Sequence, residues 1–127
     1  MPYLLDTHTF LWFAQGSDQL SEKAKFCISN PDEDKFISIA SFWEVAIKAN
    51  LGKLQLTVSI QDLYKQADKD GFIILPITIY HIEQLAKLEL HHRDPFDRLL
   101  VSQAVVDKLI LLSKDAIFSK YPTKLLW

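Results

Sequence analysis

The chain has 127 residues, which is enough for a single domain (residues 1–127) with a substantial hydrophobic core. Hydrophobic residues make up 49% of it and charged residues 24%, a balance that is typical of globular proteins and excludes extensive disorder. The formal net charge of −2 excludes nucleic-acid binding driven by bulk positive charge, so such a partner would need metal ions or a local basic patch.

The sequence gives no sign of export or of a membrane partner. Its one cysteine, Cys27, excludes an intrachain disulfide and a metal site built from several cysteines. The first residues lack the basic and continuously apolar regions of a secretory signal, and no stretch has the length of a membrane span. A cytoplasmic location is therefore expected.

The first half of the chain alternates short apolar runs with helical patterns. It predicts strands at residues 3–5 and 36–39, and helices at 10–14, 21–28 and 41–51. Asp6 or Thr7 is expected to cap the first helix. Ser41 is expected to cap the third, because Ser41 and Glu44 have the spacing of a capping box.

The second half continues the alternation. It predicts helices at 60–67, 80–90 and 95–104, strands at 72–75 and 109–112, and a short edge strand at 125–127. The apolar residues of the helix at 80–90 are expected on one side: Ile82, Leu85, Ala86 and Leu90. Apolar strands that alternate with helices predict an α/β domain whose parallel sheet is covered on both faces.

The helix that begins at Pro95 carries an acid in an unusual place. Asp94 is a good N-cap before Pro95, which suits the first helical position. On a helical projection Asp97 falls between Ala104 and Val101, inside the apolar arc, where a carboxylate is costly unless it is protonated, paired or bound to a cation. The alternative is a capping box, in which Asp97 occupies the third helical position beside the free backbone N–H groups, where a negative charge is favourable.

Acidic residues are expected at four junctions on the carboxyl edge of the sheet. They are Asp6 after the first strand, Glu44 and Asp97 in the first turns of their helices, and Asp115 after the fourth strand. Taken singly, each has a structural explanation: a helix cap, a favourable charge at a helix N-terminus, or an ion pair between Glu44 and Lys48. Their convergence instead indicates a divalent ion, and the oxygen ligands favour Mg²⁺ or Mn²⁺ over zinc.

These segments resemble the PIN-domain ribonucleases, and most closely the VapC-type toxins of bacterial toxin–antitoxin pairs. The resemblance runs from Tyr3 to the C-terminus. It is carried by Asp6-Thr7-His8, by Ser41-Phe42-Trp43-Glu44-Val45-Ala46-Ile47-Lys48 with Gly52-Lys53-Leu54, by His92-Arg93-Asp94-Pro95-Phe96-Asp97-Arg98-Leu99-Leu100, and by Ser113-Lys114-Asp115. It implies a PIN-like three-layer α/β/α sandwich around a mostly parallel sheet of four to five strands.

The resemblance also implies a function. Asp6, Glu44, Asp97 and Asp115 would form an acidic quartet for Mg²⁺ or Mn²⁺, in which Asp6 and Asp97 are direct ligands, Asp115 binds through water or a second ion, and Glu44 orients water or a second ion. Ser113 would lie beside them. The activity implied is metal-dependent hydrolysis of RNA. The partners implied are an RNA substrate, a cognate VapB-type antitoxin and a second copy of the chain in a homodimer.

Basic, histidine and aromatic residues near the expected site have less specific roles. Lys48, Lys53, Arg93 and Arg98 could contact RNA phosphates, although solvated surface charge explains each equally well. His91 and His92 are interpreted as surface or capping groups, and His8 as a packing or hydrogen-bonding group near Asp6. Most of the aromatic residues of the first half are expected in the core, and any left exposed would suit a protein partner: Trp12, Phe13, Phe42 and Trp43.

Other functions remain open at this point. The chain could be a catalytically silent PIN-fold module that binds protein or RNA, or a DNA nuclease with the same metal site. A phosphatase of the haloacid dehalogenase type also has an aspartate after its first strand. That chemistry needs a second aspartate two residues later, where this chain has His8.

Overall fold

The structure, a computed structural model, describes residues 1–127. Its strands are β1 (Tyr3–Leu5), β2 (Lys35–Ser38), β3 (Ile73–Leu75), β4 (Ile110–Leu112) and β5 (Lys124–Leu126). Its α-helices are α1 (Thr7–Gln15), α2 (Glu22–Ser29), α3 (Ile39–Asn50), α4 (Ile60–Lys69), α5 (Ile79–Lys87) and α6 (Pro95–Asp107), and a 3₁₀ helix, η1 (Ala116–Lys120), precedes β5.

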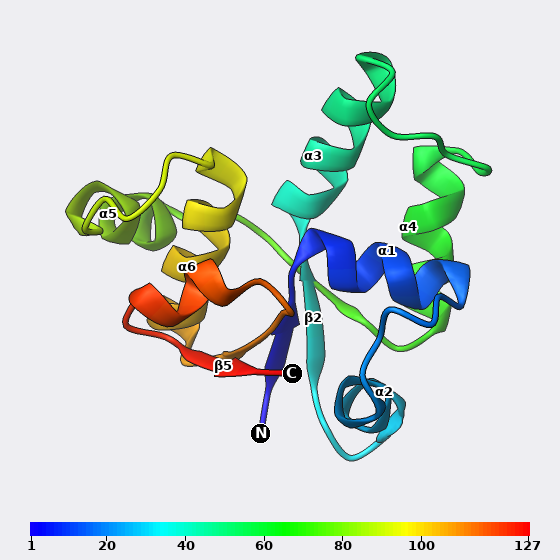
Figure 1. Cartoon of the computed structure of the whole chain (residues 1–127), viewed down its shortest axis with the longest axis horizontal. Coiled ribbons are helices and arrows are strands. Elements are labelled where there is room, and N and C mark those ends of the chain that lie inside the picture. Colours follow the sequence, from blue (N-terminus) through cyan, green and yellow to red (C-terminus); the bar gives the residue numbers. More distant parts are fainter.

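The five strands form one sheet in the order β3-β2-β1-β4-β5, and every neighbouring pair is parallel. The central strand β1 pairs Leu4 with Phe36 of β2 on one side and with Leu111 of β4 on the other. Because all strands run the same way, their carboxyl ends meet at one edge of the sheet, from which α1 and α3 begin (Figure 1). The parallel sheet confirms the predicted α/β fold, and the predicted short last strand is present as β5.

Helices cover the two faces of the sheet unequally (Figure 1). Tyr3, Leu5 and Ile37 point to the face covered by α1 to α4, where the larger core cluster lies. Leu4 and Leu111 point to the opposite face, against α6, the end of α5 and η1. The period-two alternation of the strands therefore separates two cores, giving the expected three-layer α/β/α sandwich.

Two predicted helix boundaries are wrong. The N-cap of α3 is Ser38, whose side chain accepts a hydrogen bond from the Ala40 backbone N–H, so Ser41 lies inside the helix and forms no capping box with Glu44. α5 ends at Lys87 rather than at residue 90. Its buried side also differs from the predicted one, because Ile82, Ala86 and Leu90 are exposed, whereas His81 is buried.

Candidate active site

All four predicted acids lie at the carboxyl edge of the sheet. Asp6 follows β1 and is the N-cap of α1, and Asp115 is the N-cap of η1 after β4. Glu44 lies in the second turn of α3 and not in the first as predicted, because α3 follows β2 without a loop and begins at Ile39. Asp97 lies in the first turn of α6, as predicted. The strand order reverses between β1 and β4, and ligands of open α/β sheets bind in the crevice at such a point. The topology thus gathers the acids beside a suitable crevice.

Asp6 is buried, and each of its carboxylate oxygens accepts one hydrogen bond. Its Oδ1 accepts from the Thr9 backbone N–H (2.9 Å), and its Oδ2 accepts from the Ser113 hydroxyl (2.6 Å). Burial raises the pKa of Asp6, and the hydrogen bonds from Ser113 and Thr9 and the charge of His8 only partly oppose this effect. The structure therefore places Ser113 directly beside Asp6, in a setting that favours a nearby positive charge.

Glu44 is also buried, with 3% of its side chain exposed. The Thr7 hydroxyl donates to Glu44 Oε1 (2.7 Å) and is in hydrogen-bond contact with Ser41 Oγ (2.9 Å). The Lys48 ammonium donates to Glu44 Oε2 (2.5 Å). The ion pair with Lys48 suggested by the sequence is thus present, but the carboxylate lies on the buried side of the helix and not on its exposed side.

Lys48 supplies positive charge to the acidic cluster. Burial acts to lower its pKa, but the hydrogen bond and charge of Glu44, together with the charges of Asp94 and Asp97, raise it. The ammonium therefore acts as an internal counter-ion of these carboxylates.

Replacing Lys48 with methionine is expected to destabilise the metal-free protein by about 1–2 kcal/mol. The change leaves Glu44 buried without its cation, and the cost is moderated because 37% of the Lys48 side chain is exposed. The same variant is expected to bind Mn²⁺ more tightly, since an ammonium no longer competes for the carboxylates. Thermal denaturation in EDTA and calorimetric titration with Mn²⁺ would measure the two effects. Lys65→Met, at an exposed position of α4, is the control, and unchanged values in both assays would contradict the counter-ion role.

Asp97 is the acid whose ionisation is most affected by its neighbours. Its pKa rises from the ordinary value of 3.8 to about 6, because burial and the charge of Asp94 outweigh the hydrogen bond from His92, and the charges of Glu44 and Asp6 add to the rise. Asp94 itself accepts hydrogen bonds from the Phe96 and Asp97 backbone N–H groups, as expected for the N-cap. Glu44 and Asp6 therefore lie within electrostatic reach of Asp97.

Asp115 lies on another side of Asp6. It is exposed, and its Oδ1 accepts from the Ile117 backbone N–H (3.1 Å), so the alternative role of helix cap is realised. Its own backbone N–H donates to Ser113 Oγ (3.0 Å). It lines a cavity of about 290 Å³ whose other lining residues are Asp6, His8, Trp12 and Lys114. Asp115 thus shares a pocket with Asp6 but not with the other two acids.

The carboxylate oxygens of the four acids are suitable ligands for a hard divalent ion, but the side chains lie too far apart to hold one in this structure. All four acids offer oxygen ligands, which Mg²⁺ and Mn²⁺ prefer. The raised pKa values of Asp6 and Asp97 show negative charge that the protein's own donors do not fully compensate. No group of three or more acidic, histidine or cysteine side chains in the structure is placed to hold a metal ion. Binding an ion would therefore require these side chains to move closer together.

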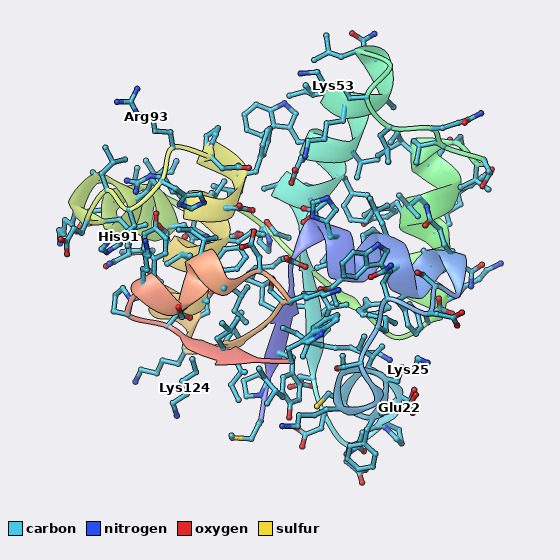
Figure 2. The ribbon with its side chains drawn as sticks, in the orientation of Figure 1. Glu22, Lys25, Lys53, His91, Arg93 and Lys124 are labelled. Atoms are coloured by element: carbon cyan, nitrogen blue, oxygen red, sulfur yellow. The ribbon has the colours of Figure 1, made fainter.

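The four basic residues considered for RNA contact differ in whether they are exposed or already paired within the protein. Lys53 and Arg93 are exposed; Lys53 lies at the end of α3 that is distant from the sheet, and Arg93 points away from the loop before α6 (Figure 2). Lys48 is paired with Glu44. The Arg98 guanidinium donates to backbone carbonyls at the end of α5 and to the Tyr121 hydroxyl, so both Nη1 and Nη2 already have partners within the protein.

Sequence reasoning missed three side chains that hold the acids in place. Thr7 holds Glu44, and His92 and Tyr121 lie behind Asp97. The position of Thr7, directly after Asp6 at the carboxyl edge, could have indicated its role. Nothing in the sequence links Tyr121 to His92, because 29 residues separate them and only the tertiary fold brings them together.

The identity of the fold follows from a sequence comparison. The family model of the PIN domain matches residues 3–124. The chain belongs to the PIN domain family. The match includes all four acids at the carboxyl edge, and PIN domains are generally nucleases. No curated protein sequence matches the chain significantly.

Solved structures share this PIN fold over nearly the whole chain. VapBC2 from Rickettsia felis, bound to a DNA fragment from its promoter, matches with a TM-score of 0.70 and 17% identity over 99% of this chain and 98% of the other. FitAcB from Neisseria gonorrhoeae matches with a TM-score of 0.69 and 17% identity over 98% of this chain and 96% of the other. The PIN domain endonuclease Utp24 matches with a TM-score of 0.52 and 17% identity over 94% of this chain and 74% of the other. The chain is therefore structurally like VapC-type toxins. None of its helices has the length and apolar character needed to cross a membrane.

Proposed function

We propose that this PIN domain is a divalent-metal-dependent endoribonuclease and the toxin of a cytoplasmic toxin–antitoxin pair. The observation that carries the proposal is that Asp6, Glu44 and Asp97, three acids from distant parts of the chain, gather at one edge of the sheet, where burial and the charge of Asp94, followed by the charges of Glu44 and Asp6, raise the pKa of Asp97. A helix cap alone would not require a largely buried carboxylate beside other acids that raise its pKa, whereas a cation site does. The family and the structural likeness to VapC-type toxins support the same function.

The acids would divide the work among them. Asp6 and Asp97 would hold Mg²⁺ or Mn²⁺ directly, with Asp115 as a ligand through water or for a second ion. Such an ion supplies a nucleophilic hydroxide near neutral pH and compensates charge on the phosphate. Glu44, held by Thr7, would orient a water molecule or a second ion, and Ser113 would keep Asp6 in its rotamer. Lys53 and Arg93 are free to contact RNA phosphates, and Lys48 and Arg98 could do so after exchanging partners.

An antitoxin partner is supported by apolar surface that the chain leaves uncovered. Trp43, on α3, is 56% exposed and packs edge-on against Phe96 with ring centroids 5.0 Å apart. Exposed apolar side chains also line α5 and the following loop: Ile79, Tyr80, Ile82 and Leu90. A VapB-type antitoxin would cover part of this surface, and a second copy of the chain in a homodimer would cover another part.

Cleavage of matched oligonucleotides would test the proposed activity. We expect purified protein, free of antitoxin, to cut an RNA in the presence of Mg²⁺ or Mn²⁺, to leave the DNA of the same sequence intact, and to lose activity in EDTA. Asp6→Asn should abolish cleavage, whereas Asp68→Asn, at an exposed position of α4, should not. Cleavage that persists in EDTA or in Asp6→Asn would overturn the proposal. Cutting of DNA alone would make the chain a DNA nuclease, and binding without cutting would make it a silent module.

A further inference from the structure

We propose that His92 and Tyr121 form a positioning pair that fixes the orientation of Asp97; this inference rests on the proposed metal-dependent function. His92 Nε2 lies 3.3 Å from Asp97 Oδ2, and His92 Nδ1 lies 2.6 Å from the Tyr121 hydroxyl. The three side chains are largely shielded, with about a fifth of His92 and Asp97 exposed and Tyr121 buried. A single chain of hydrogen bonds therefore runs from the buried Tyr121, directly after η1, to the acid of α6.

The partners of the Tyr121 hydroxyl determine which nitrogen of His92 carries the proton. The hydroxyl accepts from the His92 backbone N–H (3.3 Å) and from Arg98 Nη1 (3.4 Å). A hydroxyl has two acceptor positions and one proton, so both acceptor positions are used and the proton must be donated to Nδ1. Nδ1 is therefore the unprotonated nitrogen, and Nε2 carries the hydrogen that is donated to Asp97.

The pair is itself held rigidly. Arg98 donates to the backbone carbonyls of Leu88 and Glu89, which fixes the loop between α5 and α6. The Tyr121 ring packs edge-on against His91, with centroids 4.8 Å apart, and its other ring contact is with His92. The imidazole can therefore neither rotate nor change tautomer without losing a hydrogen bond.

The consequence for Asp97 is that its two carboxylate oxygens have different roles. Oδ2 accepts the hydrogen bond from His92, and no protein donor binds Oδ1, which is left for a cation. Groups that orient the ligands of a metal ion in this way typically contribute 10–100-fold to its affinity. The pair would act on the ion only through Asp97, so both residues are positioning residues and not catalytic ones.

The tautomer can be tested without any metal. A long-range ¹H–¹⁵N NMR spectrum of the metal-free protein should show His92 with a protonated Nε2 and an unprotonated Nδ1. In Tyr121→Phe, which keeps the ring and removes the hydroxyl, Nε2 should stay protonated because Asp97 still accepts its hydrogen, whereas the ¹⁵N resonance of Nδ1 should shift because it loses its hydrogen-bond donor. A protonated Nδ1 in the wild type, or an Nδ1 resonance that does not shift in Tyr121→Phe, would overturn the proposed hydrogen-bond chain.

Titration with Mn²⁺ tests the effect on the site. We expect His92→Phe to weaken Mn²⁺ binding about 10–100-fold, and Tyr121→Phe about two- to tenfold, as for one ordinary hydrogen bond. His92→Gln, whose amide can still donate, should fall between His92→Phe and the wild type. His91→Phe keeps the ring contact with Tyr121 and should bind as the wild type does. Equal affinities for His92→Phe and His91→Phe would overturn the inference.

Asp97→Asn separates the two proposals. If it loses Mn²⁺ binding while His92→Phe retains it, the metal site stands and the positioning role is wrong. If the wild type itself binds no Mn²⁺, the metal site and the positioning role are both wrong. Thermal denaturation of every variant in EDTA confirms that differences in affinity do not reflect unfolding.

Discussion

Asp97→Asn is expected to abolish RNA cleavage while it makes the metal-free protein more stable. The carboxylate would be a direct metal ligand, and we expect its loss to lower the cleavage rate by about 10³-fold, similar to removing one preorganised charge-stabilising group. Burial and the charge of Asp94, followed by the charges of Glu44 and Asp6, oppose the ionisation of the same carboxylate, so its charge destabilises the folded state at neutral pH. An uncharged amide of the same size removes that repulsion.

The stability gain should depend on pH in a defined direction. Folding raises the pKa of Asp97 from 3.8 to about 6, so the folded state holds the proton more tightly than the unfolded state does. The charge of Asp97 therefore does not reduce the free energy of unfolding below pH 3.8. The reduction grows between pH 3.8 and about pH 6 and is complete above that. At pH 7 we expect a net gain of about 1 kcal/mol after losses at the helix N-terminus and at His92, which corresponds to about 4 °C in Tm.

Thermal denaturation in EDTA at pH 4 and pH 7, paired with cleavage assays, would measure both effects. Asp68→Asn should change neither activity nor stability appreciably at either pH. A stabilised variant that still cleaves RNA would show repulsion at Asp97 without a catalytic role. An inactive variant with a lower Tm at pH 7 would mean that Asp97 is not repelled by its neighbours in the folded protein.

Mn²⁺ is expected to raise the Tm of the wild-type protein by about 10 °C at a concentration 100 times its Kd. Binding to the folded state alone contributes about 2.7 kcal/mol under these conditions, and each kcal/mol shifts the Tm of a domain of this size by about 4 °C. The shift should be absent in Asp6→Asn, because the buried Asp6 carboxylate would bind the ion directly. Differential scanning calorimetry with and without Mn²⁺ provides the measurement.

The same measurement on a control variant excludes nonspecific Mn²⁺ binding as the cause of the shift in Tm. Asp68→Asn keeps all four site acids and should show the full Mn²⁺ shift. An equal shift in wild type and Asp6→Asn would place the ion elsewhere on the protein and would contradict Asp6 as a ligand. A wild-type Tm that does not move would contradict the metal site altogether.

The sequence predicted those features that depend on local chemistry. Asp6, Asp94 and Asp115 are N-caps in the structure, because each is a short acidic side chain directly before a helix. The apolar runs became parallel strands, and the alternation of Tyr3, Leu4 and Leu5 between the two cores follows from strand geometry. The arrival of four acids at one edge then follows from parallel topology.

The errors occurred where tertiary contacts override local signals. Ser38 and Ser41 are both good N-caps, but α3 starts directly at the end of β2, so Ser38 takes the role and Ser41 contacts Thr7. α5 ends three residues early, and the carbonyls of Leu88 and Glu89 bond to Arg98 instead. The hydrogen bonds around Asp97 could not be predicted, since they join residues from separate segments.

The internal donors of the acidic cluster have a consequence for how the protein responds to its ionic surroundings. Each buried or half-buried carboxylate already has at least one protein donor, from Ser113, Thr7, Lys48 or His92, so the ion is not needed to hold the chain together. This differs from small zinc domains, in which metal binding and folding are one event. We expect chelation to silence the protein reversibly while it stays folded, so that activity returns as soon as ions do, without refolding or new synthesis.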